Sequence, residues 1–317
     1  MTRNIVLDLM KVCLAFMVVG LHAGFLSDIN ELWSFLTVNG IFRIAVPFFF
    51  LVNGYYFQPI SSISSLKVWM KRIIKLYTFW LIFYAYFWCR PSALSVEEII
   101  SLLKTIFVGY HHLWYLPATL GAGLLVYLIR DRLSLIWTLL LLTFFSGVGI
   151  QYAGNYHISD SITVNEILNT PFASRNFLLF GFPFFSLGFI IRTYKAEDRI
   201  SKSTIFLIIA SGFILLFLES LYNFSNPLND GGFDIYLSLL IICPAIFISC
   251  IQYQCPTRNK HLSLYSSSIY FIHPFALVII YKTIDLGNTI NSLTAIILSL
   301  LLTIILIPLN KKLRFIL

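Results

Sequence analysis

Hydrophobic residues in this chain gather in runs much longer than the core-facing stripe of a soluble helix. A helix needs about 20 apolar residues to cross a bilayer, and such runs recur along the whole sequence. They lie near residues 5–26, 35–57, 73–89, 113–129, 133–151, 176–192, 203–222, 234–252, 264–281 and 289–308. The pattern predicts an all-α integral membrane protein, a single domain over residues 1–317 built as a bundle of about ten transmembrane helices in the lipid bilayer.

Basic residues divide the loops into two sets and so predict the orientation of the spans. The set of alternate loops that includes both chain ends carries Arg3, Lys67, Lys71, Arg72, Lys75, Arg130, Arg132, Arg192, Lys195, Arg199, Lys202, Arg258, Lys260, Lys311, Lys312 and Arg314. The other set has only Arg90, Lys104, Arg175 and Lys282. Because cytoplasmic loops are enriched in Lys and Arg, we expect both termini in the cytoplasm.

The composition agrees with lipid as the main solvent of the surface. Of the 317 residues, 58% are hydrophobic, 17% aromatic and only 11% charged, whereas a soluble domain carries roughly 25% charged residues. The net charge of +8 is spread through short loops, which argues against nucleic acid as a partner. The five cysteines show no paired spacing, so we expect neither a disulfide nor a metal site. Without a Walker-type phosphate loop, ATP-driven transport has no sequence support.

Two outer loops are longer than the rest, 90–112 and 152–175. The first contains an amphipathic stretch, Val96 to Phe107, that could lie along the membrane surface. The first apolar run lacks a small-residue cleavage site, so we expect it to be a retained helix.

Ionisable side chains inside membrane helices are costly and therefore mark candidate functional positions. The first run contains Asp8, Lys11 and His22. At 100° per residue, Lys11 and His22 differ by roughly 20° around the helix, and Asp8 lies about 60° from Lys11. All three share one face. From this helix alone, a functional site and a plain i,i+3 ion pair with an interfacial histidine are equally open.

The second run places Arg43 well inside the span, followed by Pro47, Asn53 and Gly54. An unpaired arginine at that depth would be expensive. We expect its partner to be a carboxylate on another helix, such as Asp8, or the phosphates of a ligand drawn into the bundle. A purely structural ion pair is the other reading.

These residues resemble the acyltransferase-3 family of integral membrane acyltransferases, whose members begin with an aspartate and then a basic residue eleven positions before a histidine, as Asp8, Lys11 and His22 do here. A second family signature, rich in proline and aromatics and ending in a small polar residue, glycine and an aromatic, matches PFFFLVNGYYF at 47–57. Further matches follow in order: KRIIKLY at 71–77, HHLWYL at 111–116, FPFFSLGFIIR at 182–192 and SSSIYFIHP at 266–274.

The pattern is similar to the branch that acetylates surface sugars. The resemblance implies a multi-pass protein of the bacterial cytoplasmic (inner) membrane that moves an acetyl group from acetyl-CoA to a hydroxyl of a cell-envelope polysaccharide or its lipid-linked precursor. It implies no permanently bound cofactor. Two residues depart from the family pattern. Lys11 replaces the usual arginine, which keeps the charge but loses the bidentate fork, and Asn53 replaces the usual serine.

The resemblance also assigns roles. His22 is expected to be the general base that takes the hydroxyl proton or a covalent carrier of the acyl group, and the sequence does not separate these routes. Asp8 and Lys11 complete the expected catalytic set. The residues expected to bind the acyl donor are Arg43, Lys71, Arg72 and Lys75, for which positive-inside topology is the competing explanation.

Four residues are expected to contact the acceptor substrate: Asn53, His112, Trp114 and His273. His273 lies near the middle of the ninth run, where an imidazole is either hydrogen-bonded to a neighbouring helix or part of the site. His112 and Trp114 lie at the outer end of the fourth run, where an aromatic belt is expected regardless of function, and that reading is the favoured one.

A secondary transporter or flippase of a lipid-linked sugar is the strongest alternative, because it would also need charged residues along a central path. In such a transporter, Gly or Pro would break helices at corresponding positions in the two halves of the chain. Pro47 and Pro274 interrupt two runs, yet no inverted-repeat pattern is apparent. A non-catalytic partner in polysaccharide export would explain the spans but not the charged residues inside them.

Overall fold

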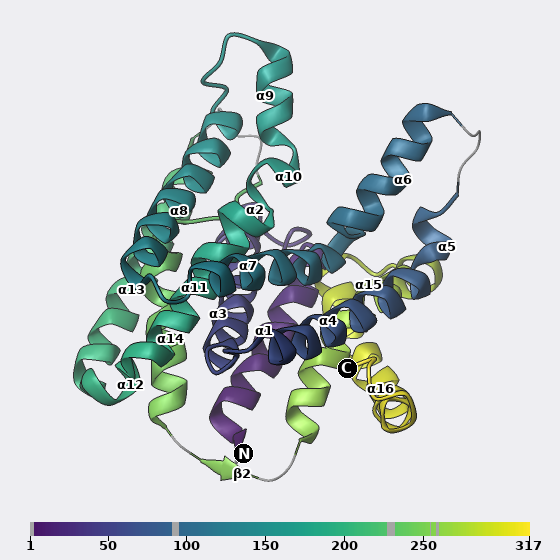
Figure 1. Cartoon of the computed structure of the whole chain (residues 1–317). Helices are drawn as coiled ribbons and strands as arrows, with labels where there is room; N and C mark the ends of the chain where they lie inside the picture. Colours follow the sequence, from purple (N-terminus) through teal and green to yellow (C-terminus); the bar gives the residue numbers. More distant parts are fainter. Residues whose placement is uncertain (1–2, 91–94, 227–231, 254, 258–259) are drawn as a thin grey trace.

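The computed structural model describes residues 3–90, 95–226, 232–253, 255–257 and 260–317 and is almost entirely helical (Figure 1). The helices are α1 Ile5–Ala23, α2 Glu31–Val38, η1 Ile41–Ile44, α3 Ala45–Phe57, α4 Ile63–Phe83, α5 Ala85–Trp88, α6 Val96–Val108, η2 His111–Trp114, α7 Tyr115–Ile129, α8 Leu133–Asn155, α9 Ile162–Asn169, α10 Pro171–Ser174, η3 Phe177–Gly181, α11 Phe182–Tyr194, α12 Ala196–Arg199, α13 Lys202–Phe224, α14 Leu239–Gln252, α15 His261–Thr283 and α16 Asn288–Leu313. Two short strands, β1 Arg3–Asn4 and β2 Pro256–Thr257, pair antiparallel.

Eight helical segments of the described residues are long and apolar enough to cross a membrane, which confirms the all-α membrane class. They are 5–23, 31–57, 111–129, 133–155, 177–194, 202–224, 261–283 and 288–313. The apolar helix at 239–252 is shorter. The predicted span at 73–89 was misplaced, because α4 begins ten residues earlier and ends at Phe83. Its start is fixed by a capping box, in which Ser62 and Ser65 exchange side-chain and backbone hydrogen bonds.

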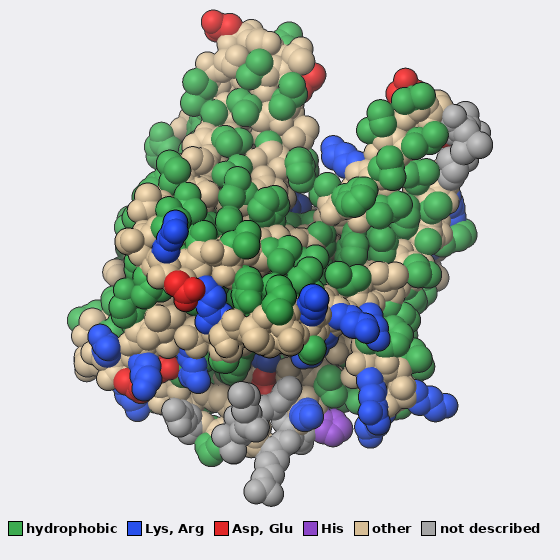
Figure 2. Space-filling view, in the orientation of Figure 1, with side chains coloured by type: hydrophobic (Ala, Val, Ile, Leu, Met, Phe, Trp, Pro, Cys, Tyr) green, Lys and Arg blue, Asp and Glu red, His purple; other side chains and the backbone are tan. Residues whose placement is uncertain are grey.

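Contacts between distant loops define the two ends of the bundle. At one end, β1 pairs with β2 and the Ile5 amide donates to the Cys255 carbonyl at 2.9 Å. At the other end, Asp28 accepts hydrogen bonds from the backbone amide (3.1 Å) and the hydroxyl of Thr289. The hydroxyl bond holds the pKa of Asp28 below its ordinary value. Most Lys and Arg side chains on the face in Figure 2 lie in its lower half, toward the N-terminus, and this is the end that the positive-inside rule predicts to be cytoplasmic.

Two arms extend from the opposite, outer end in Figure 1, one formed by α6 and the other by α9 with the end of α8. The amphipathic stretch predicted at Val96 to Phe107 is indeed a helix, α6. Its apolar side chains are exposed, with Phe107 76% accessible.

Three helices that enter from the outer end begin with an irregular turn. The 3-10 turns η1 and η2 precede α3 and α7, and the π-turn η3 precedes α11. Non-α backbone at membrane depth is tolerated where protein buries it or where it lines a cavity, and it often marks functional positions. These turns carry several of the polar residues described below.

Helices α3 and α11 approach each other closely through two glycines. A Cβ added at Gly54 would lie 1.8 Å from the Phe185 carbonyl oxygen, and one at Gly188 would lie 2.0 Å from that of Leu51. The glycine of the NGYYF motif is therefore a packing residue, because only a residue without a Cβ atom lets these two backbones touch.

Glu219, a carboxylate inside α13 that the sequence analysis did not single out, has a structural explanation. It accepts hydrogen bonds from the Leu237 amide (2.7 Å) and from the amide and hydroxyl of Ser238 (3.0 and 2.7 Å). These donors lie at the start of α14, where backbone N–H groups lack helical partners. Glu219 thus caps a neighbouring helix.

Candidate active site

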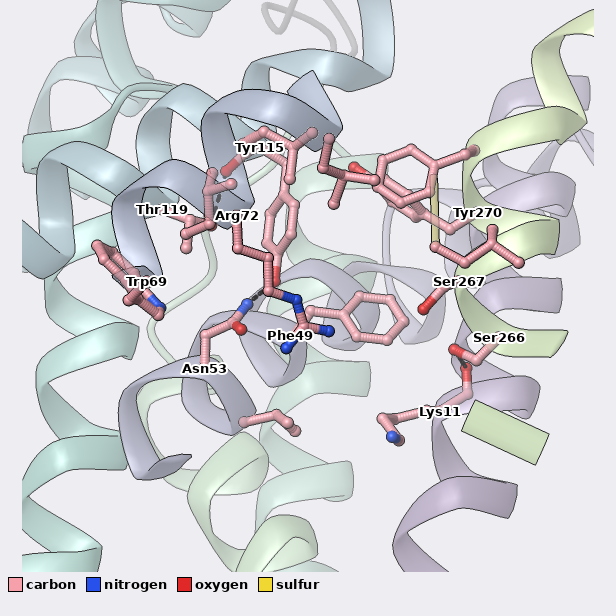
Figure 3. A pocket seen from close by; sticks show the side chains of 16 residues that line it. Lys11, Phe49, Asn53, Trp69, Arg72, Tyr115, Thr119, Ser266, Ser267 and Tyr270 are labelled. Atoms are coloured by element: carbon pink, nitrogen blue, oxygen red, sulfur yellow. Dashed lines mark hydrogen bonds between the residues drawn. The ribbon is translucent and has the colours of Figure 1, made fainter. Parts of the chain in front are cut away.

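A cavity of about 260 Å³ lies in the inner half of the bundle, between α1, α3, α4, α7 and α15. Its polar lining comes from Lys11, Asn53, Arg72, Thr119, Ser266 and Ser267, together with the aromatic residues Phe49, Trp69, Tyr115, Tyr270 and Phe271. Figure 3 shows Lys11, Ser266 and Ser267 approaching from one side, opposite Arg72 and Asn53. The cavity combines cations, hydroxyls and apolar walls.

Lys11 is fixed at the edge of this cavity by its neighbours. It forms the predicted i,i+3 ion pair with the buried Asp8, and its Nζ also donates to the Ser263 hydroxyl at 3.0 Å. The Ser266 hydroxyl donates in turn to the Lys11 carbonyl at 2.9 Å. The start of α1 is therefore bound to the start of α15, and the ammonium stays directed into the bundle.

Of the residues expected to bind the donor on α4, Arg72 alone lines the cavity within the described part of the chain. Lys71 is exposed, and the Lys75 ammonium lies 6.0 Å from the centroid of the Phe315 ring. Asn53, across the cavity, donates to the Tyr115 hydroxyl. The structure thus places one arginine of this basic cluster in the cavity lining and the two lysines outside it.

Four histidines meet above this cavity. The His22 ring centroid lies 4.7 Å from that of His111 and 5.1 Å from that of His273. His112 lies 5.2 Å from His273. The sequence analysis singled out His22, His112 and His273 separately and did not include His111 among the expected site residues. The HHLWYL motif was the signal that could have linked them, since it places two imidazoles at one helix start.

Local backbone geometry explains how the two adjacent histidines both reach the cluster. His111 has φ of 49°, in the left-handed region that side chains seldom adopt. It begins η2, directly before α7. Strained backbone of this kind persists where the surrounding structure requires it and is common at functional sites.

The cluster holds a buried ring nitrogen without a partner. Within the described residues, Nε2 of His273 has no hydrogen bond. Tyr270 lies between the cluster and the inner cavity: it lines the cavity, and its hydroxyl donates to the His112 carbonyl at 2.8 Å. The two sites therefore share a wall.

On its outer side the cluster borders a second cavity of about 170 Å³, lined by His22, Tyr84, Phe87, Tyr110, His111, Pro274, Leu277, Val278 and Tyr281. Trp114 lines an adjacent groove of about 240 Å³, together with Phe107, Phe172 and Arg175. The Arg175 guanidinium lies 6.0 Å from the centroid of the Trp114 ring. An acceptor could thus approach the imidazoles from the outer end.

Arg43 has a partner other than the one expected. It pairs with Asp234, which also accepts a hydrogen bond from Nε of Arg175 at 2.8 Å. Asp8 cannot reach Arg43, because it lies near the inner end of α1, whereas Arg43 lies in η1, toward the outer end. Arg43 does not line the inner cavity among the described residues. Asp234, the first residue of the predicted run 234–252, was overlooked for want of a second charge near it in sequence.

Comparison with curated proteins gives relatives of greater length. The chain is 25% identical to an amino-acid racemase of Enterococcus faecalis, over 97% of this chain and 46% of that protein. It is 26% identical to a serine/alanine racemase of Enterococcus gallinarum, over 94% of this chain and 45% of that protein. The chain therefore spans about half the length of these relatives. No solved structure is significantly similar to it.

The family comparison covers nearly the whole chain. A family model described as an acyltransferase domain matches residues 4–309, which include the inner cavity and the histidine cluster. Together with the membrane helices and the ordered motifs, this match shows that the chain belongs to the acyltransferase-3 family of membrane acyltransferases.

Proposed function

We propose that the protein is an O-acyltransferase of the bacterial cytoplasmic membrane that moves acetyl from acetyl-CoA to a hydroxyl of a cell-envelope polysaccharide or its lipid-linked precursor. One observation carries the proposal: a cation-lined inner cavity lies directly beneath a cluster of four imidazoles. Acyl transfer to an alcohol needs an anionic donor held in place and a base or nucleophile near its thioester. The two sites supply these functions.

The donor would occupy the inner cavity. Arg72 and Lys11 lie on opposite sides of it and can meet phosphate or carbonyl oxygens. Lys71 and Lys75 lie outside the cavity lining, where they would act on the head group by long-range attraction. Arg43 is better placed to hold the outer end together through Asp234 than to bind the donor.

The acceptor would reach the imidazoles from the outer side. His22 and His111 line the outer cavity, and Trp114 borders the adjacent groove with Arg175. Aromatic faces beside hydrogen-bonding groups suit a sugar ring. His112 and His273 are buried in the cluster itself, so a hydroxyl, and not a whole sugar, would contact them.

The relatives favour a second candidate function. Both are named as racemases of amino acids, and a membrane domain in such proteins could carry a small amino acid across the bilayer. The two functions differ in one product, free CoA, because acyl transfer breaks a thioester and transport does not. Release of free CoA from acetyl-CoA by the purified protein, measured with a thiol reagent, would support transfer and exclude a carrier alone.

The decisive variant is His22→Ala. We expect it to abolish acetylation of envelope polysaccharide in cells, scored by mass analysis, while protein level and membrane insertion stay normal. His261→Ala is a matched control, because that histidine begins α15 at the cytoplasmic end, far from the cluster. Normal acetylation in His22→Ala would remove this residue from the mechanism.

A further inference from the structure

One imidazole of the cluster has its protonation site set by the backbone. In an α-helix the N–H of residue i donates to the carbonyl of residue i−4, and proline has no N–H. Pro274 therefore leaves the Tyr270 carbonyl of α15 without its helical donor. Nδ1 of His273 lies 2.7 Å from that oxygen and 3.3 Å from the Ile269 carbonyl oxygen. The His273 ring thus donates the hydrogen bond that Pro274 cannot.

This hydrogen bond fixes the tautomer of His273. A neutral imidazole has one N–H and one bare nitrogen, so a proton on Nδ1 leaves the lone pair on Nε2. That nitrogen is buried and has no partner within the described residues. Its ring lies 5.1 Å from His22 and 5.2 Å from His112. Because buried acceptors are normally paired, the unpaired Nε2 indicates that a polar group of a ligand supplies its hydrogen bond.

His22 differs from His273 in this respect. Its ring is stacked against that of His273 and tilted against that of His111, and no hydrogen bond to it is found in the part of the chain that the structure describes. It also lines the outer cavity. A ring that is accessible and not committed to one tautomer can present a nitrogen to an incoming carbonyl.

On these grounds we propose that the two histidines divide the reaction, an inference that rests on the proposed function. His22 carries the acyl group, and Nε2 of His273 is the general base that accepts the proton of the acceptor hydroxyl. The Tyr270 carbonyl orients that base and stabilises its protonated form. Nucleophile, base and orienting group then follow the logic of other covalent acyl transferases.

The two steps balance. In the first, a His22 nitrogen attacks the thioester carbonyl, the C–S bond breaks, and the CoA thiolate takes the proton from the other His22 nitrogen. In the second, the hydroxyl oxygen attacks the acyl-imidazole, its proton passes to Nε2 of His273, and the C–N bond breaks. The His22 imidazolate recovers that proton from His273. Thioester and alcohol become ester and thiol.

The test uses His273→Asn, because an asparagine amide can still donate to the Tyr270 carbonyl but offers no base at the position of Nε2. With acetyl-CoA, the purified variant should release a single equivalent of CoA and carry an acetyl group on His22, found by peptide mass analysis. Transfer to polysaccharide from cells that lack the protein should fall about 10²- to 10⁴-fold. His22→Ala should release none.

Several results would overturn the inference. Wild-type transfer to polysaccharide by His273→Asn would show that His273 is not the base. Absence of acetyl on His22 in His273→Asn, with an active wild type, would also reject the division of roles. A wild-type protein that never releases CoA would overturn the proposed function itself, so the two failures are distinguishable.

A spectroscopic measurement tests the tautomer without relying on activity. Ring ¹⁵N spectra of histidine-labelled protein, with His273→Asn used to assign the signal, should show a protonated Nδ1 and a bare Nε2. In Pro274→Ala the new amide competes for the Tyr270 carbonyl, and part of the signal should move to the other tautomer. A protonated Nε2 in the wild type would reject the proposal.

Discussion

The Asp8–Lys11 pair shows how one charged residue serves two neighbours at the level of the side chain. Lys11 neutralises a buried carboxylate, donates to Ser263 and still lines the inner cavity. An ammonium can do this because its three donors point in different directions. The family's usual arginine would offer more donors in a planar fork. Charge, more than shape, is therefore the property that position 11 requires.

We expect Lys11→Arg to retain acetyl transfer and Lys11→Gln to lose it. Glutamine is similar in length but neutral, so Asp8 would be left without its counter-charge, at a cost of about 3 to 5 kcal/mol for a buried pair. Transfer should be compared at matched protein levels in membranes. Equal activity of Lys11→Gln and wild type would show that no charge is needed here.

Neighbouring cations on α4 provide a second test at this scale. Arg72→Ala should weaken CoA binding by about tenfold or more, because charge-assisted hydrogen bonds are worth roughly 1.5 to 3 kcal/mol. Lys71→Ala should change the affinity little, since both side chains are exposed but Arg72 lines the cavity and Lys71 does not. Calorimetric titration of both purified variants with CoA would decide. Equal losses would mean that the cluster acts only through its total charge.

At the scale of helices, α3 and α11 pack closely because Gly54 and Gly188 have no Cβ. Membrane helices lack a hydrophobic driving force between them and depend on such close approach. The contact places Asn53, one residue before Gly54, against the inner cavity. A motif that the family resemblance marked as functional thus has its glycine in packing and its asparagine in the site.

Gly54→Ala should therefore destabilise the fold. The added methyl would meet the Phe185 backbone carbonyl, which cannot move aside as a flexible side chain can. Overpacking of this kind costs about 1 to 3 kcal/mol. Gly149→Ala in α8 is the matched control, because nothing lies within 4 Å of its added Cβ. Thermal unfolding in detergent should show a lower midpoint for Gly54→Ala only, and equal midpoints would contradict the packing argument.

The sequence was sufficient for the all-α membrane class because lipid imposes long apolar runs, but it predicted about ten spans where eight helical segments of the described residues are long and apolar enough to cross. It failed at 73–89, where α4 is amphipathic and its polar half lies outside any apolar window. It also failed to pair Arg43 with Asp234, since these residues are 191 positions apart. Distances between helices depend on packing, which periodicity does not encode. The four histidines illustrate this: the HHLWYL motif indicates that two of them adjoin, but the contact of these two with His22 and His273 depends on how α1, α7 and α15 pack.

For the whole molecule, the arrangement of charge and cavities implies a direction of transfer. Cations lie toward the end that is predicted to be cytoplasmic, the inner cavity lies next, and the histidine cluster lies beyond it. Along α1, Lys11 and His22 are separated by about 16 Å at 1.5 Å per residue. A donor bound at the cytoplasmic end would thus have to extend its thioester arm up to the imidazoles.

Sealed membrane vesicles can test this direction. Acetyl-CoA added to inside-out vesicles should acetylate an acceptor, whereas the same addition to right-side-out vesicles should not, because the highly charged donor cannot cross the bilayer to reach Arg72 and Lys11. Permeabilising both preparations with detergent should make their rates equal, which controls for the amount of protein. Arg72→Ala should raise the donor concentration needed in inside-out vesicles. Activity in the right-side-out vesicles alone would place the donor site at the outer end and reverse the proposed path, and equal rates in the two sealed preparations would contradict a one-sided donor site.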